Sequence, residues 1–163
     1  MSLGPVVSDN SPLVGLFNLN LLSLLRDLYT EVLIPRAVEN EFLRWSPIAR
    51  REALDNAPWI RVVDLQNPQK TEDGYRPGDG EAAAFAFADE KKARFVLMDD
   101  KKARKEAKER GLIVKGIVGV LMEAKEKRLI DKVEPHLIAL KDSGVRLGES
   151  VIRLALEKAG EAD

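Results

Sequence analysis

The sequence contains no cysteine and only one histidine, and both scarcities narrow the chemistry open to the chain. Without cysteine there is no disulfide, no thiol nucleophile and no cysteine-based zinc site. The lone His136 excludes a metal site made of several imidazoles, and its local sequence offers no acidic or nucleophilic partner. We therefore expect an ordinary surface role for His136 and look to carboxylates for any metal chemistry.

An excess of charge of one sign is also missing, because 26 basic and 27 acidic residues leave a net charge of −1. Any nucleic-acid binding would therefore depend on a local basic patch. No apolar run reaches membrane-spanning length, and the N-terminus lacks the basic start and apolar core of a signal peptide. We expect a cytoplasmic protein without a membrane partner.

The 163 residues, 45% of them apolar and 33% charged, suit one folded domain. Strand-like segments alternate with helix-like ones, which predicts a parallel sheet covered on both faces. The strands are expected at 5–8, 31–34, 59–63, 94–98 and 113–114. The helices are expected at 12–28, 35–43, 47–54, 80–92, 101–110, 117–127, 133–140 and 148–156, with one long polar loop at 66–78. The predicted fold is therefore a three-layer α/β fold with a central parallel sheet of four to five strands.

Acidic side chains follow several of these strands. Asp9 ends the first strand and precedes Ser11 and Pro12, which are typical of a helix cap and first helical residue. The carboxyl ends of parallel strands are where open α/β sheets bind ligands. The acidic pair Asp99-Asp100 ends the fourth strand in the same way. Two distant strands would thus bring carboxylates to one edge.

Two helices add further acids to this pattern. Glu41 lies on the apolar side of the helix after the second strand, and Glu81 lies in the first turn of an alanine-rich helix. Mg²⁺ and Mn²⁺ prefer carboxylate and water oxygens, so the acids together indicate a divalent-metal site. Taken singly, each acid has a plainer interpretation as a turn, a cap or a solvated helix face. Sequence spacing alone does not show that they converge.

A cationic segment follows the acidic pair. Lys101, Lys102, Arg104, Lys105 and Lys108 occupy one predicted helix, and Lys115 comes soon after. Such cations would bind phosphates and make binding salt-dependent. Because Glu106 and Glu109 are interleaved, an exposed charged helix is the alternative interpretation. Stacking of bases would need exposed aromatics, for which Trp45 and Tyr75 are candidates, whereas Trp59 is expected in the core.

Taken in order, these segments resemble the DUF3368 branch of the PIN-domain proteins, over residues 5 to 150. The similar segments are Val7 to Leu13, Val32 to Pro35 with Val38 and Glu41, Gly80 to Ala82, Leu97 to Arg104, Gly116 to Leu121, Ala124-Lys125, Leu129-Ile130 and Gly144 to Leu147. Asn10 and Ile117 depart from the pattern, because relatives often carry a small or hydroxyl-bearing residue there. Neither departure removes a carboxylate.

The resemblance implies a Rossmann-like PIN fold and an endoribonuclease that hydrolyses RNA with one or two Mg²⁺ or Mn²⁺ ions. It assigns the metal to Asp9, Glu81 and the Asp99/Asp100 pair, of which Asp100 is favoured, and adds Glu41 to the catalytic set. RNA contacts are expected at Ser11, Lys101, Lys102 and Arg104. Similarity to VapC-like toxins further suggests a small antitoxin and a homodimer.

Other functions fit the sequence less well. A dinucleotide-binding protein would need a glycine-rich turn after the first strand, which Asp9 to Pro12 do not provide. The remaining alternative is a nucleic-acid-binding or protein-interaction module with little nuclease activity. We expect residues 1–4 to be an added or disordered N-terminus, 5–150 the PIN-like domain, and 151–163 a C-terminal helix and tail.

Overall fold

The structure, a computed structural model, describes residues 4–64 and 80–162. The loop predicted at 66–78, which contains Tyr75, lies outside the described residues. Within them, one all-parallel sheet has the strand order β3-β2-β1-β4-β5. The strands are β1 (Val6–Ser8), β2 (Val32–Pro35), β3 (Ile60–Val63), β4 (Phe95–Leu97) and β5 (Val114–Lys115).

Strand order reverses beside β1. The chain first moves outward from β1 through β2 to β3, and then returns to place β4 on the other side of β1. Val6 accordingly pairs with Val32 of β2 and with Phe95 of β4. The carboxyl ends of β1 and β4 therefore form the topological switch point, where open α/β sheets leave a crevice for ligands.

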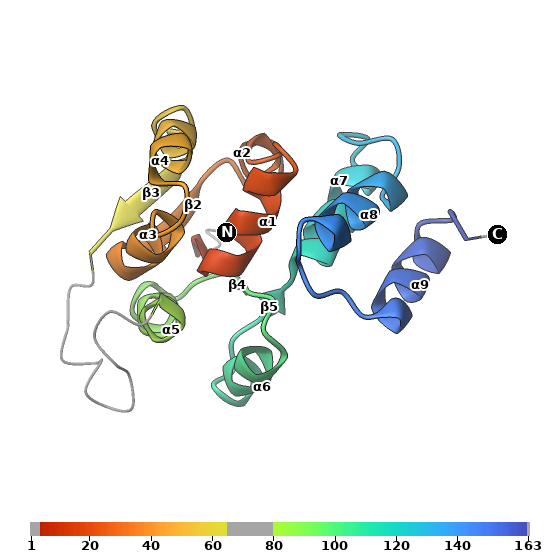
Figure 1. The fold of residues 1–163 in the computed structure, drawn as a ribbon. Coiled ribbons are helices and arrows are strands. Elements are labelled where there is room, and N and C mark those ends of the chain that lie inside the picture. Colours follow the sequence, from red (N-terminus) through yellow and green to blue (C-terminus); the bar gives the residue numbers. More distant parts are fainter. Residues whose placement is uncertain (1–3, 65–79, 163) are drawn as a thin grey trace.

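Helices cover both faces of this sheet (Figure 1). Alternate strand residues point to opposite faces, so Val6 and Phe95 join one core cluster while Val7 and Val96 join the other. The first cluster includes side chains of α1 (Asn10–Asn18), α2 (Ser23–Tyr29), α3 (Arg36–Phe42), α4 (Pro47–Asp55), α7 (Ile117–Glu126), α8 (Glu134–Asp142) and α9 (Glu149–Lys158). The second includes side chains of α5 (Gly80–Lys91) and α6 (Lys101–Glu109). The predicted three-layer α/β fold is confirmed.

Two helix boundaries differ from the prediction. Ser11 is not the cap of the first helix, because α1 begins at Asn10 and the extended Asp9 holds the N-cap position. The backbone N–H of Asp9 still donates to the Leu97 carbonyl (2.9 Å), so the helix starts directly at the end of the sheet ladder. The helix predicted over 12–28 is also divided. Asn20 has a left-handed φ of 57°, which separates α1 from α2.

The leucines of α2 belong to the core. Leu24 and Leu25 are buried in the first cluster. Trp59 packs against the same cluster and donates from Nε1 to the Leu22 carbonyl (3.0 Å), whereas Trp45 is 69% exposed. Among the described residues, no helix combines the length and apolar character needed to cross a membrane.

A carboxylate near the C-terminus forms hydrogen bonds with both α7 and the start of α8. Glu161 accepts hydrogen bonds from the backbone N–H groups of Val133 (2.8 Å) and Glu134 (3.0 Å), at the start of α8. It also accepts one from Lys125 Nζ of α7 (2.8 Å). Burial raises the pKa of Glu161, but the bonds from Lys125 and the two backbone groups outweigh it and lower that pKa to about 2.

We predict that Glu161→Gln lowers the free energy of unfolding at pH 7 by about 0.5–2 kcal/mol, the usual value of a helix cap. Because the pKa of Glu161 is lower in the folded chain than in the unfolded chain, its stabilisation is complete above about pH 5. It is lost as the pH falls toward 2. Urea denaturation at pH 7 and pH 3 should therefore show a smaller difference at pH 3. The control is Glu157→Gln at an exposed position of α9; a pH-independent difference for Glu161→Gln would contradict the account.

Candidate functional site

Asp9 lies at the switch point of the sheet. It is 7% exposed and follows β1, and its backbone N–H bonds to the last residue of β4. The hydroxyl of Ser8 donates to the Asp9 carbonyl (2.8 Å), which further fixes the backbone. Because β1 and β4 are adjacent and parallel, the acids that follow them lie at the same edge, as the sequence predicted.

The two members of the acidic pair have different tasks. Asp99 Oδ1 accepts a hydrogen bond from the Ile117 N–H (2.8 Å), at the first residue of α7. Burial raises the pKa of Asp99, while that hydrogen bond and the charge of Arg104 act in the opposite direction. Asp100 is exposed and caps α6, because its Oδ2 accepts from the Ala103 N–H (3.1 Å).

Gly116 allows β4 and α7 to approach this closely. A Cβ at this position would lie 2.8 Å from Asp99 Oδ1 and 3.4 Å from Arg104 Nη1. Any larger residue would have to push the carboxylate or the guanidinium aside. The pairing of Asp99 with the start of α7 therefore depends on a residue without a side chain.

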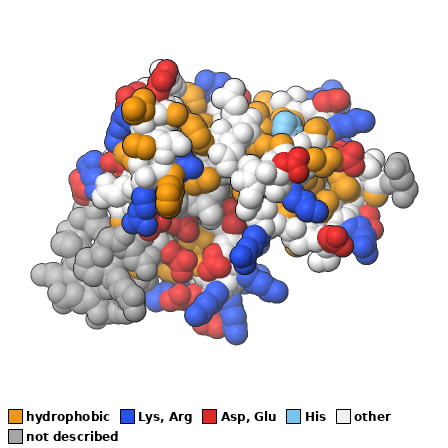
Figure 2. All heavy atoms as spheres, in the orientation of Figure 1, with side chains coloured by type: hydrophobic (Ala, Val, Ile, Leu, Met, Phe, Trp, Pro, Cys, Tyr) orange, Lys and Arg blue, Asp and Glu red, His pale blue; other side chains and the backbone are white. Residues whose placement is uncertain are grey.

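The topology brings Glu81 to the same edge of the sheet. Helix α5 connects β3 to the parallel strand β4, so it runs back along the sheet and its first turn lies at the carboxyl end of the strands. Glu81 occupies that first turn and is partly buried. Figure 2 shows acidic side chains gathered between α5 and α6, with Lys and Arg side chains beside them.

Helix α3 carries a second acid besides the predicted Glu41. Glu41 is half-buried, and Glu39 is more deeply buried, at 8% exposed. Glu39 pairs with Arg36 Nη1 (3.3 Å) and with Arg51 Nη1 of α4 (3.4 Å). Glu39 is not among the residues predicted from the sequence, although its spacing of three residues from Arg36 is a signal for an ion pair on one helix.

The acids lie at one edge of the sheet but, as far as the structure describes the chain, do not form a complete set of ligands for a metal ion. Within the described residues, no three acidic or histidine side chains stand close enough together to hold one ion. The shared metal site therefore stays a prediction. The donor set nevertheless suits Mg²⁺ or Mn²⁺, because Mg²⁺ is usually held by one or two carboxylates together with waters and substrate phosphates.

An orphaned oxygen beside Asp9 adds to this donor set. Asn10 Oδ1 is buried and has no hydrogen-bond partner among the residues that the structure describes. An unsatisfied buried acceptor is costly, so such atoms in a folded protein call for an explanation. An amide oxygen is also a hard ligand or water acceptor. The position at which Asn10 departs from the family pattern thus still offers oxygen chemistry.

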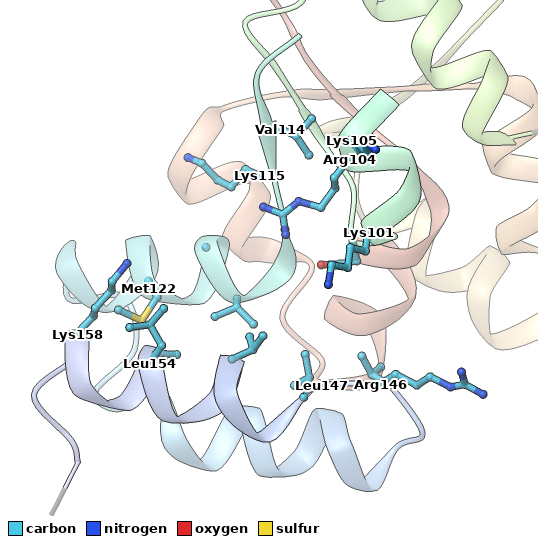
Figure 3. Close-up of a pocket in the computed structure, with 18 of the residues that line it drawn as sticks. Lys101, Arg104, Lys105, Val114, Lys115, Met122, Arg146, Leu147, Leu154 and Lys158 are labelled. Atoms are coloured by element: carbon cyan, nitrogen blue, oxygen red, sulfur yellow. The ribbon is translucent and has the colours of Figure 1, made fainter. Parts of the chain in front are cut away.

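The predicted cationic residues lie on the α6 side of the acids. Lys101 and Lys102 are exposed, Arg104 is half-buried, and Ser11 is exposed at the start of α1. Arg104 reaches from α6 toward the N-terminal end of α7 (Figure 3). Arg104 therefore lies next to Asp99, on the side facing α7.

Comparison with known proteins supports the resemblance seen in the sequence. Residues 5–161 match the family DUF3368, described as a PIN domain. This match extends through α9 to Glu161. No curated protein matches the chain.

Proposed function

Because the chain belongs to the DUF3368 family of PIN domains, we propose that it is a Mg²⁺- or Mn²⁺-dependent endoribonuclease that hydrolyses phosphodiester bonds of RNA. The observation that carries the proposal is the buried Asp9 at the switch point, beside the acidic pair that follows β4. PIN domains are generally nucleases that use divalent ions, and the acids offered here are of that chemical type.

The acids would share the work according to their surroundings. Asp9 and Asp100 would hold the ion directly, with Glu81 and Glu41 contributing through water or directly. When bound, Mg²⁺ or Mn²⁺ supplies a Lewis acid for the phosphate and lowers the pKa of water. Asp99, bonded to the Ile117 N–H and close to Arg104, would position the start of α7 and the phosphate-binding cation.

The cations of α6 would place the RNA. Lys101 and Lys102 are exposed and Arg104 is half-buried beside Asp99, and in this proposal all three contact a phosphate near the acids. Ser11, exposed in the first turn of α1, could donate a hydroxyl hydrogen bond to the same phosphate. These contacts position the backbone and carry no sequence information.

Two further proposals rest on the resemblance to VapC-like proteins. The chain would be the toxin of a toxin–antitoxin pair, held by a small antitoxin, and would form a homodimer. The competing function is an RNA- or protein-binding module with the PIN fold and little nuclease activity, which the departures at Asn10 and Ile117 favour. Retention of the acids at one sheet edge supports the nuclease.

The experiment that separates these functions is a metal titration with end-labelled RNA. A nuclease should cut the RNA when Mg²⁺ or Mn²⁺ is added and stop when EDTA is added, whereas a pure binder should shift the RNA and leave it intact. Intact RNA at saturating protein and millimolar metal would contradict the proposed activity.

The acidic pair provides a sharper prediction. Asp100→Asn should reduce metal-dependent cleavage by about 100-fold or more, as loss of a group that stabilises charge in the transition state does. The cap of α6 should survive in this variant, because Asn is as good a cap as Asp. Asp99→Asn should keep more cleavage activity than Asp100→Asn. It should also be at least as stable as wild type at pH 7.

The reason for that stability lies in the sign of the pKa change. The pKa of Asp99 is raised by burial, so the folded chain binds the proton more readily than the unfolded chain. The free energy of unfolding therefore falls as the pH rises from the pKa of Asp99 in the unfolded chain to its higher pKa in the folded chain. Asp99→Asn removes that loss and keeps an acceptor for the Ile117 N–H. If Asp99→Asn instead cleaved RNA more slowly than Asp100→Asn, Asp99 would be the residue that faces the metal.

A further inference from the structure

A cleft of about 930 Å³ begins at Asp99 and runs away from the acidic edge. One wall is α6 and β5, and the other is α7, the segment before α9, and α9 itself. Figure 3 shows Lys101 near one end of the cleft, with Lys158, Met122 and Leu154 gathered near the other. The cleft therefore connects the candidate catalytic acids with the C-terminal helix.

The charged side chains that line the cleft are almost all cationic. Among the described residues, Asp99 is the single acid of the lining, against seven cations: Lys101, Arg104, Lys105, Lys108, Lys115, Arg146 and Lys158. Lys115 is paired with Glu123 (2.7 Å). Within the described part of the chain, the other six form no ion pair. In a protein with a net charge of −1, this is a local basic surface that attracts a polyanion.

Between the cations the lining is aliphatic. Val151 and Leu154 of α9 turn toward the cleft and remain 46% and 51% exposed. They face further apolar side chains, namely Val114, Val118, Met122, Val145 and Leu147. Over 4–64 and 80–162, no aromatic side chain and no neutral hydrogen-bonding side chain lines the cleft. A ligand would thus be held by its charges and by apolar contact, without groups that read a base edge.

We propose that this cleft binds single-stranded RNA, with phosphates on the cations and base and ribose faces against the aliphatic floor between α7 and α9. The proposal rests on the proposed function for the identity of the polyanion, because the cleft starts at the acids that would cut it. A single strand exposes both phosphates and base faces, whereas a duplex hides the base faces in its stack. The binding should tolerate any sequence.

The test measures binding by fluorescence anisotropy of a fluorescein-labelled 12-nucleotide oligouridylate, in EDTA so that no cleavage occurs. Lys158→Gln should weaken binding about threefold or more and lower the slope of log affinity against log salt by about 0.7, the value for one phosphate contact on a single strand. Leu154→Ser should weaken binding without changing the slope. Lys132→Gln, at an exposed position outside the cleft, is the matched control and should change neither.

Three results would overturn the proposal. They are an unchanged slope in Lys158→Gln, equally tight binding of a 12-base-pair RNA duplex, and displacement of the RNA by polyglutamate of equal charge at equal concentration. The last result would assign the cleft to an acidic protein partner. Failure of this proposal is distinguishable from failure of the proposed nuclease activity. RNA that binds through Lys158 but is never cut refutes only the nuclease activity. Cleavage that is insensitive to Lys158→Gln and Leu154→Ser refutes only RNA binding in the cleft.

Discussion

Asp9→Asn should reduce metal-dependent RNA cleavage by at least about 100-fold and leave the fold intact. The substitution keeps the size of the side chain and removes a buried carboxylate at the switch point. In the proposed mechanism this carboxylate holds the metal ion, and groups that stabilise transition-state charge are commonly worth 10²–10³ in rate. Initial rates of cleavage of labelled RNA at saturating Mn²⁺ provide the measurement.

The control for this prediction is Asp131→Asn, which removes an exposed carboxylate between α7 and α8 and should cut RNA as wild type does. Both variants should show cooperative thermal unfolding. Wild-type activity in Asp9→Asn would remove the mechanism, because no other acid occupies the end of β1.

Phe42→Ala should lower the free energy of unfolding by about 3–5 kcal/mol, the usual cost of truncating a buried aromatic side chain. Phe42 is fully buried at the end of α3 and meets the ring of Phe17 edge-on at 5.7 Å. The guanidinium of Arg50 lies 5.0 Å from the Phe42 ring and 5.4 Å from that of Phe17. Arg50 Nη1 also donates to the Phe42 carbonyl (2.8 Å). Truncation would leave a cavity beside a buried cation, and urea denaturation measures the loss.

Phe42→Leu separates the two parts of that loss. It retains much of the apolar volume and removes the contact between the Phe42 and Phe17 rings. An aromatic pair of this kind is worth about 0.5–1.5 kcal/mol. The leucine variant should therefore be clearly more stable than the alanine variant. Equal stability of the two variants would show that the cavity is not the main term.

The sequence predicted the sheet well because buried parallel strands are short apolar runs separated by helices. The runs ending at Asp9 and at Asp99 both form strands, and their pairing brings the two ends together. The split of the first helix was not predicted, because apolar spacing continues from Leu16 to Leu25 across the left-handed Asn20. Periodicity reports which face is apolar, and it does not report where one helix stops and the next begins.

The roles of individual acids were harder to predict. The role of a carboxylate depends on the groups that it contacts, and these come from distant segments of the chain. Asp99 accepts from Ile117, eighteen residues away, and Glu39 pairs with Arg51 of another helix. Neither contact follows from local spacing. The cleft could not be predicted from the sequence either, because its cations come from α6, β5, the segment before α9 and α9 itself, and only the α6 group forms a run.

The most direct test of the nuclease proposal is anomalous diffraction from crystals of the full chain soaked with Mn²⁺. The account predicts one or two Mn²⁺ peaks with carboxylate oxygens of Asp9 and Asp100 as ligands and Glu81 nearby. A Mn²⁺ peak bound only elsewhere, or none at millimolar Mn²⁺, would contradict it.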